Sequence, residues 1–398
     1  MFAQRKLLVP MLALSCLVLL SGCWSAVELN NNAFARIMLL DKAKEGIELT
    51  LEFALPNRMV PGQAGGGGGQ SGPPFSYVTK RDGDVAKAYR DIQSDMSRTV
   101  TFGQLRVVVM SSKLAEDGVE AILDFFTRES KTHINANIYV TEGPTAQLTT
   151  IPVRFERFPT DILASYAEEQ VTVSVTFKDL LMSNFAGGDL LVPLLVFGRQ
   201  GTDKENDSKE WMGTGGAAIF KAGKMVGKLN TEETRGALWI LGQVKDSEVN
   251  VASPTDGRTV NFLVTHEATR IETEFGGRPT FHIRCKANAE VLASDSDIDL
   301  EDPEQLSKLE KKLAAALEER MGRAIDKTRL LRSDAFQLGS YVRWRNYREW
   351  NRIKENWREI YATTANITED ADITISRLGS ARKSIVRERV KLSGGEIE

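Results

Sequence analysis

The longest regular patterns in the sequence are two stretches in which apolar and polar residues alternate, 259–275 and 279–292, joined by Gly276-Gly277. Alternation with a period of two places one set of side chains on the buried face of a strand. Two such runs around a glycine pair predict an antiparallel hairpin. Asp302, Pro303 and Gln305 then carry the signals of a helix start, and a leucine-rich stripe follows over 306–325. This helix is expected to cover the hairpin.

Shorter patterns elsewhere mix the same two kinds of element. Helical spacing predicts a helix over 85–96, one over 117–128 opened by a capping box at Asp117 and Glu120, and one over 350–360. Residues 232–241 fit a short helix or a strand. Strand patterns lie at 47–55, 102–110, 134–140, 171–177 and 367–375, and a hairpin is predicted over 213–229 around Ala222-Gly223. The sequence therefore predicts an α+β fold.

The chain has 398 residues, which is enough for two or three domains. Polar residues 198–209 predict a boundary near 200–210. We expect an N-terminal α+β domain at 23–200, a small middle domain at 210–258 and a C-terminal α+β domain at 259–380. The charged residues 381–398 are expected to form a disordered tail.

Glycine and proline dominate residues 61–74, which predicts a flexible loop inside the first domain. A phosphate-binding loop is the alternative for such a segment. That loop requires a helix to open directly from the glycines, whereas Pro73-Pro74 and a strand pattern starting at Phe75 follow here. Nucleotide binding is therefore disfavoured.

The first 22 residues have the pattern of a secretory signal peptide. Arg5 and Lys6 precede an apolar run over 7–20, which is short for a permanent span of a roughly 30 Å hydrocarbon core. The run ends in Leu20-Ser21-Gly22-Cys23, which resembles the bacterial lipobox. We predict cleavage after residue 22 and lipidation of Cys23, as an N-palmitoyl and S-diacylglycerol cysteine. An ordinary signal peptide with an incidental cysteine is the alternative.

The composition excludes several chemistries. A net charge of −3 gives no basic field for binding nucleic acid. The cysteines number three, too few for a disulfide framework, and Cys285 falls on the apolar face of a predicted strand, as expected of a core thiol. His266 and His282 lie on the two runs of the predicted hairpin and face each other in one possible register, but two ligands make no zinc site. We expect no catalytic, cofactor or metal site.

Two charged segments have functional alternatives. The acidic residues 295–302 lack the glycine and terminal glutamate of a calcium loop, so a solvated loop is expected. The segment 343–350 mixes arginine with aromatic residues, as nucleic-acid or membrane-interface surfaces do. A packed amphipathic helix is favoured, because Trp350 and Trp357 share its apolar stripe. Trp344 and Tyr347 lie outside that stripe and are candidates for contact with a partner or with lipid headgroups.

Four blocks in order resemble the Ger(x)C family of spore germination lipoproteins. The first is Cys23-Trp24 with Val27-Glu28-Leu29-Asn30, where Ser25 replaces a usual aspartate. The second is 101–109 followed by 118–128, where Gln104 replaces a usual histidine. The central block comprises 215–220, 225–229 and Glu233-Thr234, and the last comprises 334–339 and 350–357. The resemblance covers nearly the whole chain after residue 22.

The resemblance implies three mixed sheet-and-helix domains and a non-enzymatic C subunit of a nutrient germinant receptor. It further implies tethering to the outer face of the spore inner membrane and two integral-membrane partners, the A and B subunits of the receptor. A solute-binding lipoprotein that delivers a nutrient to a permease is the rival interpretation, and it requires a concave site with convergent polar groups. A lipid-anchored hydrolase would need a nucleophile or metal constellation, which the sequence does not offer.

Overall fold

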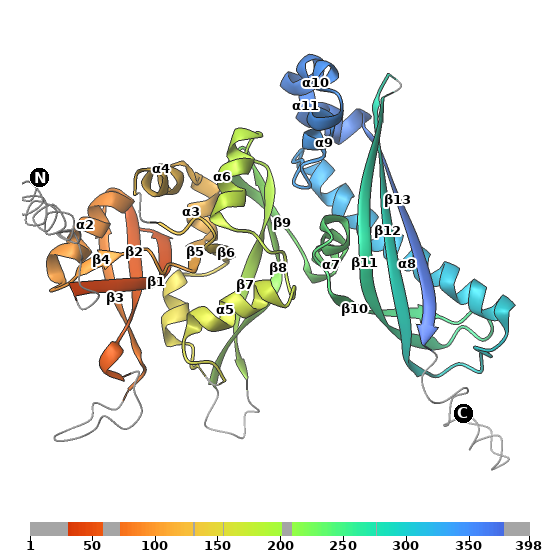
Figure 1. Ribbon diagram of the computed structural model, residues 1–398, viewed down its shortest axis with the longest axis horizontal. Helices are drawn as coiled ribbons and strands as arrows, with labels where there is room; N and C mark the ends of the chain where they lie inside the picture. The colour runs from red at the N-terminus through yellow and green to blue at the C-terminus, as the bar shows by residue number, and fades with distance from the viewer. Residues whose placement is uncertain are drawn as a thin grey trace, which may run out of the picture.

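The computed structural model describes residues 31–58, 72–129, 132–153, 155–200, 209–275 and 277–377. Within these residues the strands form two sheets, each with helices packed against it, so the fold is α+β as the sequence predicts. Figure 1 shows the two sheets side by side along the long axis of the molecule. The predicted signal peptide, most of the glycine-rich loop and the predicted tail lie outside the described residues.

The first sheet has the strand order β3-β2-β1-β5-β6-β7-β8-β9, and the short β4 pairs with β1. Strands β1, β5, β6 and β7 are parallel neighbours, and the strands at both ends of the order add antiparallel pairs. The strands are β1 (Asn32–Lys42), β2 (Ile47–Ala54), β3 (Phe75–Asp82), β4 (Thr99–Thr101), β5 (Val107–Ser111), β6 (Asn137–Thr141), β7 (Leu190–Gln200), β8 (Lys209–Lys221) and β9 (Lys224–Leu229).

Both faces of this sheet are buried. Met38 and Val108 point into a large core that continues through the molecule, whereas Ile37 and Val107 point into a smaller core on the opposite face. Such runs of continuous burial are typical of parallel strands covered on both sides. The covering helices are α2 (Val85–Asp95), α3 (Ser112–Asp117), α4 (Glu120–Arg128), α5 (Pro159–Glu168) and α6 (Phe177–Phe185). Two short 3₁₀ segments, η2 (Pro56–Arg58) and η3 (Thr145–Thr150), follow β2 and β6.

The second sheet confirms the predicted hairpin. Its order is β10-β11-β12-β13, with β10 (Asp246–Ala252), β11 (Thr259–Phe275), β12 (Pro279–Ser294) and β13 (Asn366–Arg377). Helix α8 (Pro303–Leu330) packs on this sheet with Leu309, Leu313, Leu317 and Met321 buried, and the Asp302 side chain caps its start as predicted. Helix α7 (Thr231–Leu241) packs beside α8. Cys285 on β12 is buried in this core, which confirms the structural interpretation of its thiol.

The polar segment at 200–210 connects two strands of the same sheet. Strands β7 and β8 pair antiparallel on either side of it, down to Gln200 and Lys209. Residues 210–258 are therefore shared between the sheets, because β8 and β9 extend the first sheet and β10 starts the second. The domain division itself stays a prediction, but the strand pairing does not follow its expected boundary at 200–210.

Four local predictions need correction. Residues 171–177 are no strand: Val173 and Val175 are buried in irregular backbone, and Thr176 caps α6. The strand predicted over 102–110 starts only at Val107. Helix α4 begins at Glu120 without a side-chain cap, so the capping box at Asp117 does not form. The strand register pairs Glu272 with His282 and Ala287 with His266, so the two histidines do not face each other.

The predicted last helix is broken into short pieces. After α9 (Leu338–Arg345) come α10 (Tyr347–Ile353), the 3₁₀ turn η4 (Lys354–Asn356), α11 (Trp357–Glu359) and the π-helical turn η5 (Ile360–Thr364). The breaks turn Trp357 into the core while Trp350 packs partly buried beside it, their ring centroids 5.7 Å apart. The predicted packing of Trp350 and Trp357 is confirmed, but the prediction of one continuous helix is wrong.

Candidate functional site

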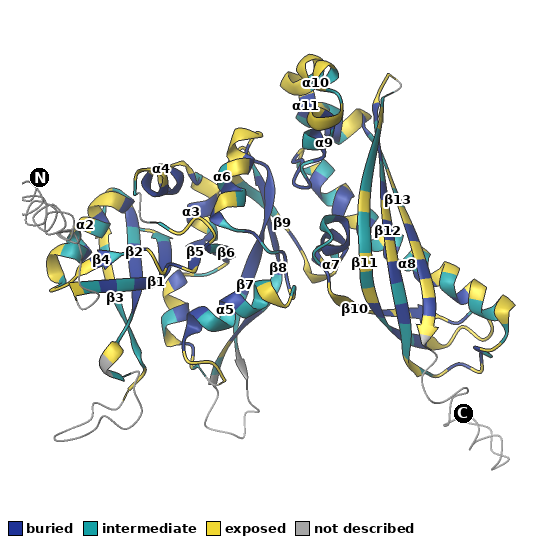
Figure 2. Cartoon of the chain, viewed as in Figure 1, coloured by how far each residue is buried: buried dark blue, intermediate teal, exposed yellow. Residues whose placement is uncertain are grey.

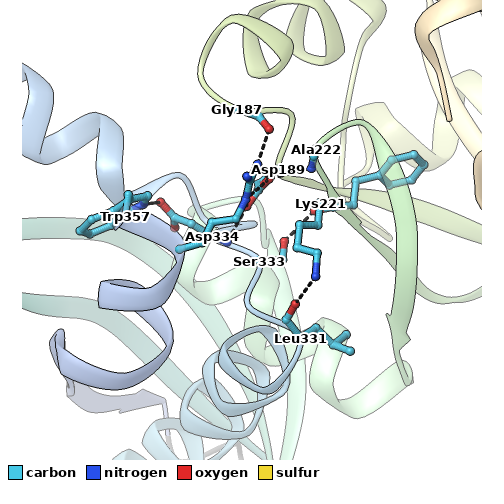
Figure 3. Close-up of polar contacts among 10 residues, drawn as sticks. Gly187, Asp189, Lys221, Ala222, Leu331, Ser333, Asp334 and Trp357 are labelled. Atoms are coloured by element: carbon cyan, nitrogen blue, oxygen red, sulfur yellow. Dashed lines mark hydrogen bonds and ion pairs between the residues drawn. The ribbon is translucent and has the colours of Figure 1, made fainter. Parts of the chain in front are cut away.

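The polar contacts between the first sheet and the C-terminal helices gather at one point, which we call the junction: Asp189, Ser333, Asp334, Trp357 and Arg358 (Figure 3). Asp189 stands just before β7 in the first sheet. The other four residues follow α8 or lie on α11. The junction therefore joins parts of the chain that are far apart in sequence.

Asp189 is positioned by tight turns in the first sheet. Two residues of positive φ, Ala222 and Gly223, turn β8 into β9, as the sequence predicts for this hairpin. The Ala222 N–H donates to Asp189 Oδ1 at 2.9 Å, and the Gly223 N–H donates to the carbonyl of Gly188 at 2.8 Å. A Cβ on Gly188 would lie 2.5 Å from the Gly223 nitrogen, so only glycine allows this approach. Asp189 is therefore fixed by backbone.

Asp334 occupies the corresponding place on the C-terminal side. Its carboxylate accepts hydrogen bonds from the N–H groups of Leu338 at 2.8 Å and Gly339 at 2.7 Å, which are unpaired donors in the first turn of α9. The Trp357 indole Nε1 donates to the same carboxylate at 2.7 Å. A Cβ at Gly339 would lie 2.6 Å from Trp357 Nε1, so glycine is needed for the indole to reach Asp334.

Asp189 is joined to the C-terminal side by the Arg358 side chain and by the Asp334 backbone. Arg358 Nη2 lies 2.7 Å from Asp189 Oδ1 and also donates to the Gly187 carbonyl at 2.5 Å. The Asp334 N–H donates to Asp189 Oδ2 at 3.0 Å. Ser333 Oγ donates to the Phe220 carbonyl at 2.6 Å, and Lys221 Nζ donates to the Leu331 carbonyl at 3.2 Å. Figure 3 shows these contacts bridging the two parts of the molecule.

Burial sets the electrostatics of the junction. Asp334 is almost inaccessible to solvent, and this burial raises its pKa to about 7, although the Gly339, Trp357 and Leu338 donors oppose the rise. Hydrogen bonds to Asp189 raise the pKa of Arg358. Each buried polar group at the junction thus has a partner, which is the condition for burying charge without a large loss of stability.

A pocket of about 550 Å³ opens beside the junction. Phe185 and Gly187 line it from the first sheet's side, and Arg343, Trp350 and Lys354 line it from the C-terminal helices. Aromatic and charged side chains converge there, as they do in sites for small polar ligands. Chemically, the junction fastens two parts of the chain, and the pocket beside it can hold a small solute.

The other predicted positions are dispersed. Cys23 lies outside the described residues. His266 Nε2 bonds Thr269 Oγ1 at 2.9 Å and His282 Nδ1 bonds Thr368 Oγ1 at 2.8 Å, so each has a structural partner in its own sheet. Across the described ranges, no three His, Cys, Asp or Glu side chains cluster closely enough to hold a metal ion. No helix in the described part of the chain has the length and apolar character needed to cross a membrane.

No pattern in the sequence predicts the junction. Asp189 and Arg358 are 169 residues apart, and neither belongs to a motif with a known spacing. The available signal is weak: Asp189 follows a glycine pair, and Asp334 precedes a short helix whose start has no other side-chain cap. The last block of the family resemblance contains Asp334 and Trp357, but gives them no role.

Comparisons with known proteins agree along the whole described chain. A model described as "Spore germination protein N-terminal domain" matches residues 25–197, and one described as "Spore germination B3/ GerAC like, C-terminal" matches 215–379. Spore germination protein KC of Bacillus subtilis (strain 168) is 26% identical over 394 residues, covering 94% of this chain and 96% of that protein. Spore germination protein B3 of the same organism is 25% identical over 386 residues, covering 92% and 96%.

A solved structure shares the fold. The crystal structure of the GerBC protein superposes with a TM-score of 0.55 at 18% sequence identity, covering 85% of this chain and 96% of that one. At this identity the likeness shows the fold alone. It supports the α+β arrangement of two sheets with flanking helices.

Proposed function

Because this chain belongs to the Ger(x)C family of spore germination proteins, we propose that it is a lipid-anchored, non-enzymatic subunit of a nutrient germinant receptor. The observation that carries the proposal is the tandem match of the two family models, which span 25–197 and 215–379 in order. The first match begins two residues after Cys23, so the lipobox stands where the mature protein would start. In this proposal the A and B subunits in the membrane are its partners.

The anchor explains how such a subunit assembles. Each buried CH₂ of an acyl chain contributes about 0.8 kcal/mol, and two or more chains give stable attachment. A tethered domain reaches a high effective concentration beside membrane partners, so modest protein contacts suffice for assembly. The folded domains would then lie on the outer face of the spore inner membrane.

Replacing Cys23 tests the proposal in spores. Cys23→Ala removes the acylation site, and Cys16→Ser is the matched control because it removes the other N-terminal thiol, which lies within the apolar run 7–20. We expect Cys23→Ala to release the protein from the membrane fraction and to abolish the nutrient response of this receptor, while Cys16→Ser behaves as wild type. A membrane-bound Cys23→Ala protein in spores that germinate normally would contradict the proposal.

The pocket beside the junction supports a second candidate, capture of a nutrient for delivery to a permease. Thermal unfolding of residues 24–398, which include every described residue, would be measured with amino acids, sugars and nucleosides. Solute capture predicts a rise in the melting temperature that Lys354→Gln reduces, because Lys354 lines the pocket. The receptor-subunit proposal predicts no ligand-dependent rise, since other subunits would hold the germinant.

A further inference from the structure

The corner between α9 and α10 carries an exposed basic and aromatic surface. We call Arg343, Trp344, Arg345, Tyr347 and Arg348 the α9–α10 corner. Trp344 is 74% exposed and Tyr347 is 62% exposed, which is unusual for such large apolar rings. The three arginines are also exposed. Figure 2 shows these helices with much of their surface exposed at one edge of the molecule.

The arginines of the corner are not used in ion pairs of the described fold. Within the described ranges none of the three arginines forms an ion pair, whereas the nearby Arg352 pairs with Glu349. Helix α9 packs through the buried Leu338 and Val342, and α10 packs through the partly buried Trp350 and Ile353, none of which belongs to the corner. The fold therefore does not require the corner's residue types.

The corner is nevertheless held in a defined shape. The Asn346 N–H closes α9 on the Val342 carbonyl at 2.8 Å, and the Asn346 side chain caps α10 by accepting from the Glu349 N–H at 3.1 Å. The Trp344 ring packs against Tyr341 with the ring centroids 5.5 Å apart. The two exposed rings and three arginines thus stand together on a short, capped turn.

The charge of the corner is opposite to that of the chain. Residues 343–348 contain three arginines and no acidic residue, while the chain as a whole carries a net charge of −3. A local basic patch on an acidic protein attracts an anionic partner. The exposed rings favour a membrane as this anionic partner, because tryptophan and tyrosine are enriched at membrane–water interfaces.

We propose that the α9–α10 corner binds anionic membrane lipid directly. Trp344 and Tyr347 would lie at the level of the headgroups, and the arginines would bind lipid phosphates, for which the planar guanidinium is suited. Phe185 on α6, which is 77% exposed, lines the same pocket as Arg343. This inference extends the proposed lipid tethering, but it concerns the folded chain without its anchor.

Vesicle binding by residues 24–398 tests the proposal, because this fragment keeps every described residue and lacks Cys23. Phosphatidylcholine vesicles containing phosphatidylglycerol would be compared with phosphatidylcholine alone, at increasing salt. The test variant is Arg343→Gln/Arg345→Gln/Arg348→Gln. The matched control is Lys87→Gln/Arg90→Gln/Arg98→Gln, which removes the same charge from exposed positions in and after α2.

We expect binding to the anionic vesicles only, weakened by salt. Each arginine near a lipid surface is worth about a fivefold change in affinity, so the corner variant should lose up to about 100-fold and the control little. Trp344→Ala/Tyr347→Ala should also weaken vesicle binding but keep its salt dependence. Phe155→Ala is the control for this variant and should leave binding unchanged, because its ring is 99% exposed but lies outside the corner.

Three outcomes would overturn the proposal: no binding to anionic vesicles, equal binding to neutral ones, or equal loss in the control variant. The absence of vesicle binding would point to an acidic protein surface as the partner of the corner. Because the fragment has no anchor, none of these outcomes bears on Cys23. The germination test of Cys23→Ala is read separately, so failure of the one proposal is distinguishable from failure of the other.

Discussion

The junction and the α9–α10 corner both contain arginine and tryptophan, and they lie close together in the C-terminal helices, but their side chains are in opposite situations. At the junction, Trp357 is buried and Arg358 is paired with Asp189. At the corner, Trp344 is exposed and Arg345 has no ion pair within the described ranges. Arginine and tryptophan therefore stabilise the fold at the junction, where carboxylates pair with them. At the corner the same residue types are exposed and can bind another molecule.

The largest expected loss in the free energy of unfolding comes from a substitution at the junction residue Asp334. Asp334→Ala would leave three N–H donors, on Leu338, Gly339 and Trp357, without their acceptor inside the protein. Loss of a buried charged partner costs about 3 to 5 kcal/mol. Urea unfolding of residues 24–398 measures the loss, with Glu355→Ala as the control, since Glu355 is exposed beside the same pocket. A loss equal to that of the control would show that the junction is not structural.

The pH dependence of the same carboxyl group gives the next effect. Burial raises the folded-state pKa of Asp334 from an ordinary value of 3.8 to about 7. A raised pKa means that the folded chain binds the proton more tightly, so the contribution of Asp334 to the free energy of unfolding is full below pH 3.8 and is lost as the pH rises to about 7. Asp189 and Arg358 are the charged side chains that face Asp334, and both are present in wild type and in a variant at position 334.

Unfolding of wild type and Asp334→Asn from pH 5 to pH 8 tests this prediction. The free energy of unfolding of wild type should fall relative to the variant as the pH rises, and then level off above about 7. The exposed Asp372→Asn should track wild type at every pH. A difference between wild type and Asp334→Asn that does not change with pH would contradict the assignment.

Arg358→Ala should have a smaller effect than Asp334→Ala. The Arg358 side chain is 40% exposed, and Asp189 keeps two backbone donors after its loss. Truncation should cost roughly 1 to 3 kcal/mol, because the carboxylate that remains is nearly buried. The matched control is Arg352→Ala, whose pair with Glu349 is on the surface and should be worth less than about 1 kcal/mol. Equal losses in the two variants would remove the distinction between junction and surface.

The smallest effect on stability is expected at the corner itself. Trp344→Ala/Tyr347→Ala removes rings that are mostly exposed, so the free energy of unfolding should change by no more than about 0.5 kcal/mol. Urea unfolding measures this directly. A loss of several kcal/mol would mean that the rings are part of the core, and the corner would then not be a free binding surface.

Local sequence patterns predicted the elements that periodicity alone determines. The hairpin of β11 and β12, the capped start of α8, the β8–β9 turn and the burial of Cys285 follow from alternation, capping residues and glycine positions. These features depend on residues close together in the chain. The family resemblance followed from short blocks in order, for the same reason.

Features that depend on distant partners were not predictable. Val173 and Val175 alternate like a strand, but their neighbours bury them in irregular backbone and the capping box at Thr176 starts a helix instead. The predicted last helix is broken, and the indole of Trp357 and the guanidinium of Arg358 reach Asp334 and Asp189. A local sequence pattern does not predict a hydrogen-bond partner that lies more than a hundred residues away, as Asp189 does from Arg358.

In the proposed function, this chain acts from the membrane surface through acylated Cys23. The mass of the N-terminal peptide, obtained from protein extracted with detergent from the membranes of sporulating cells, tests it most directly. We expect a chain that begins at Cys23 and carries the added mass of acyl groups. A chain that retains residues 1–22, or begins elsewhere with no acyl group at Cys23, would contradict it.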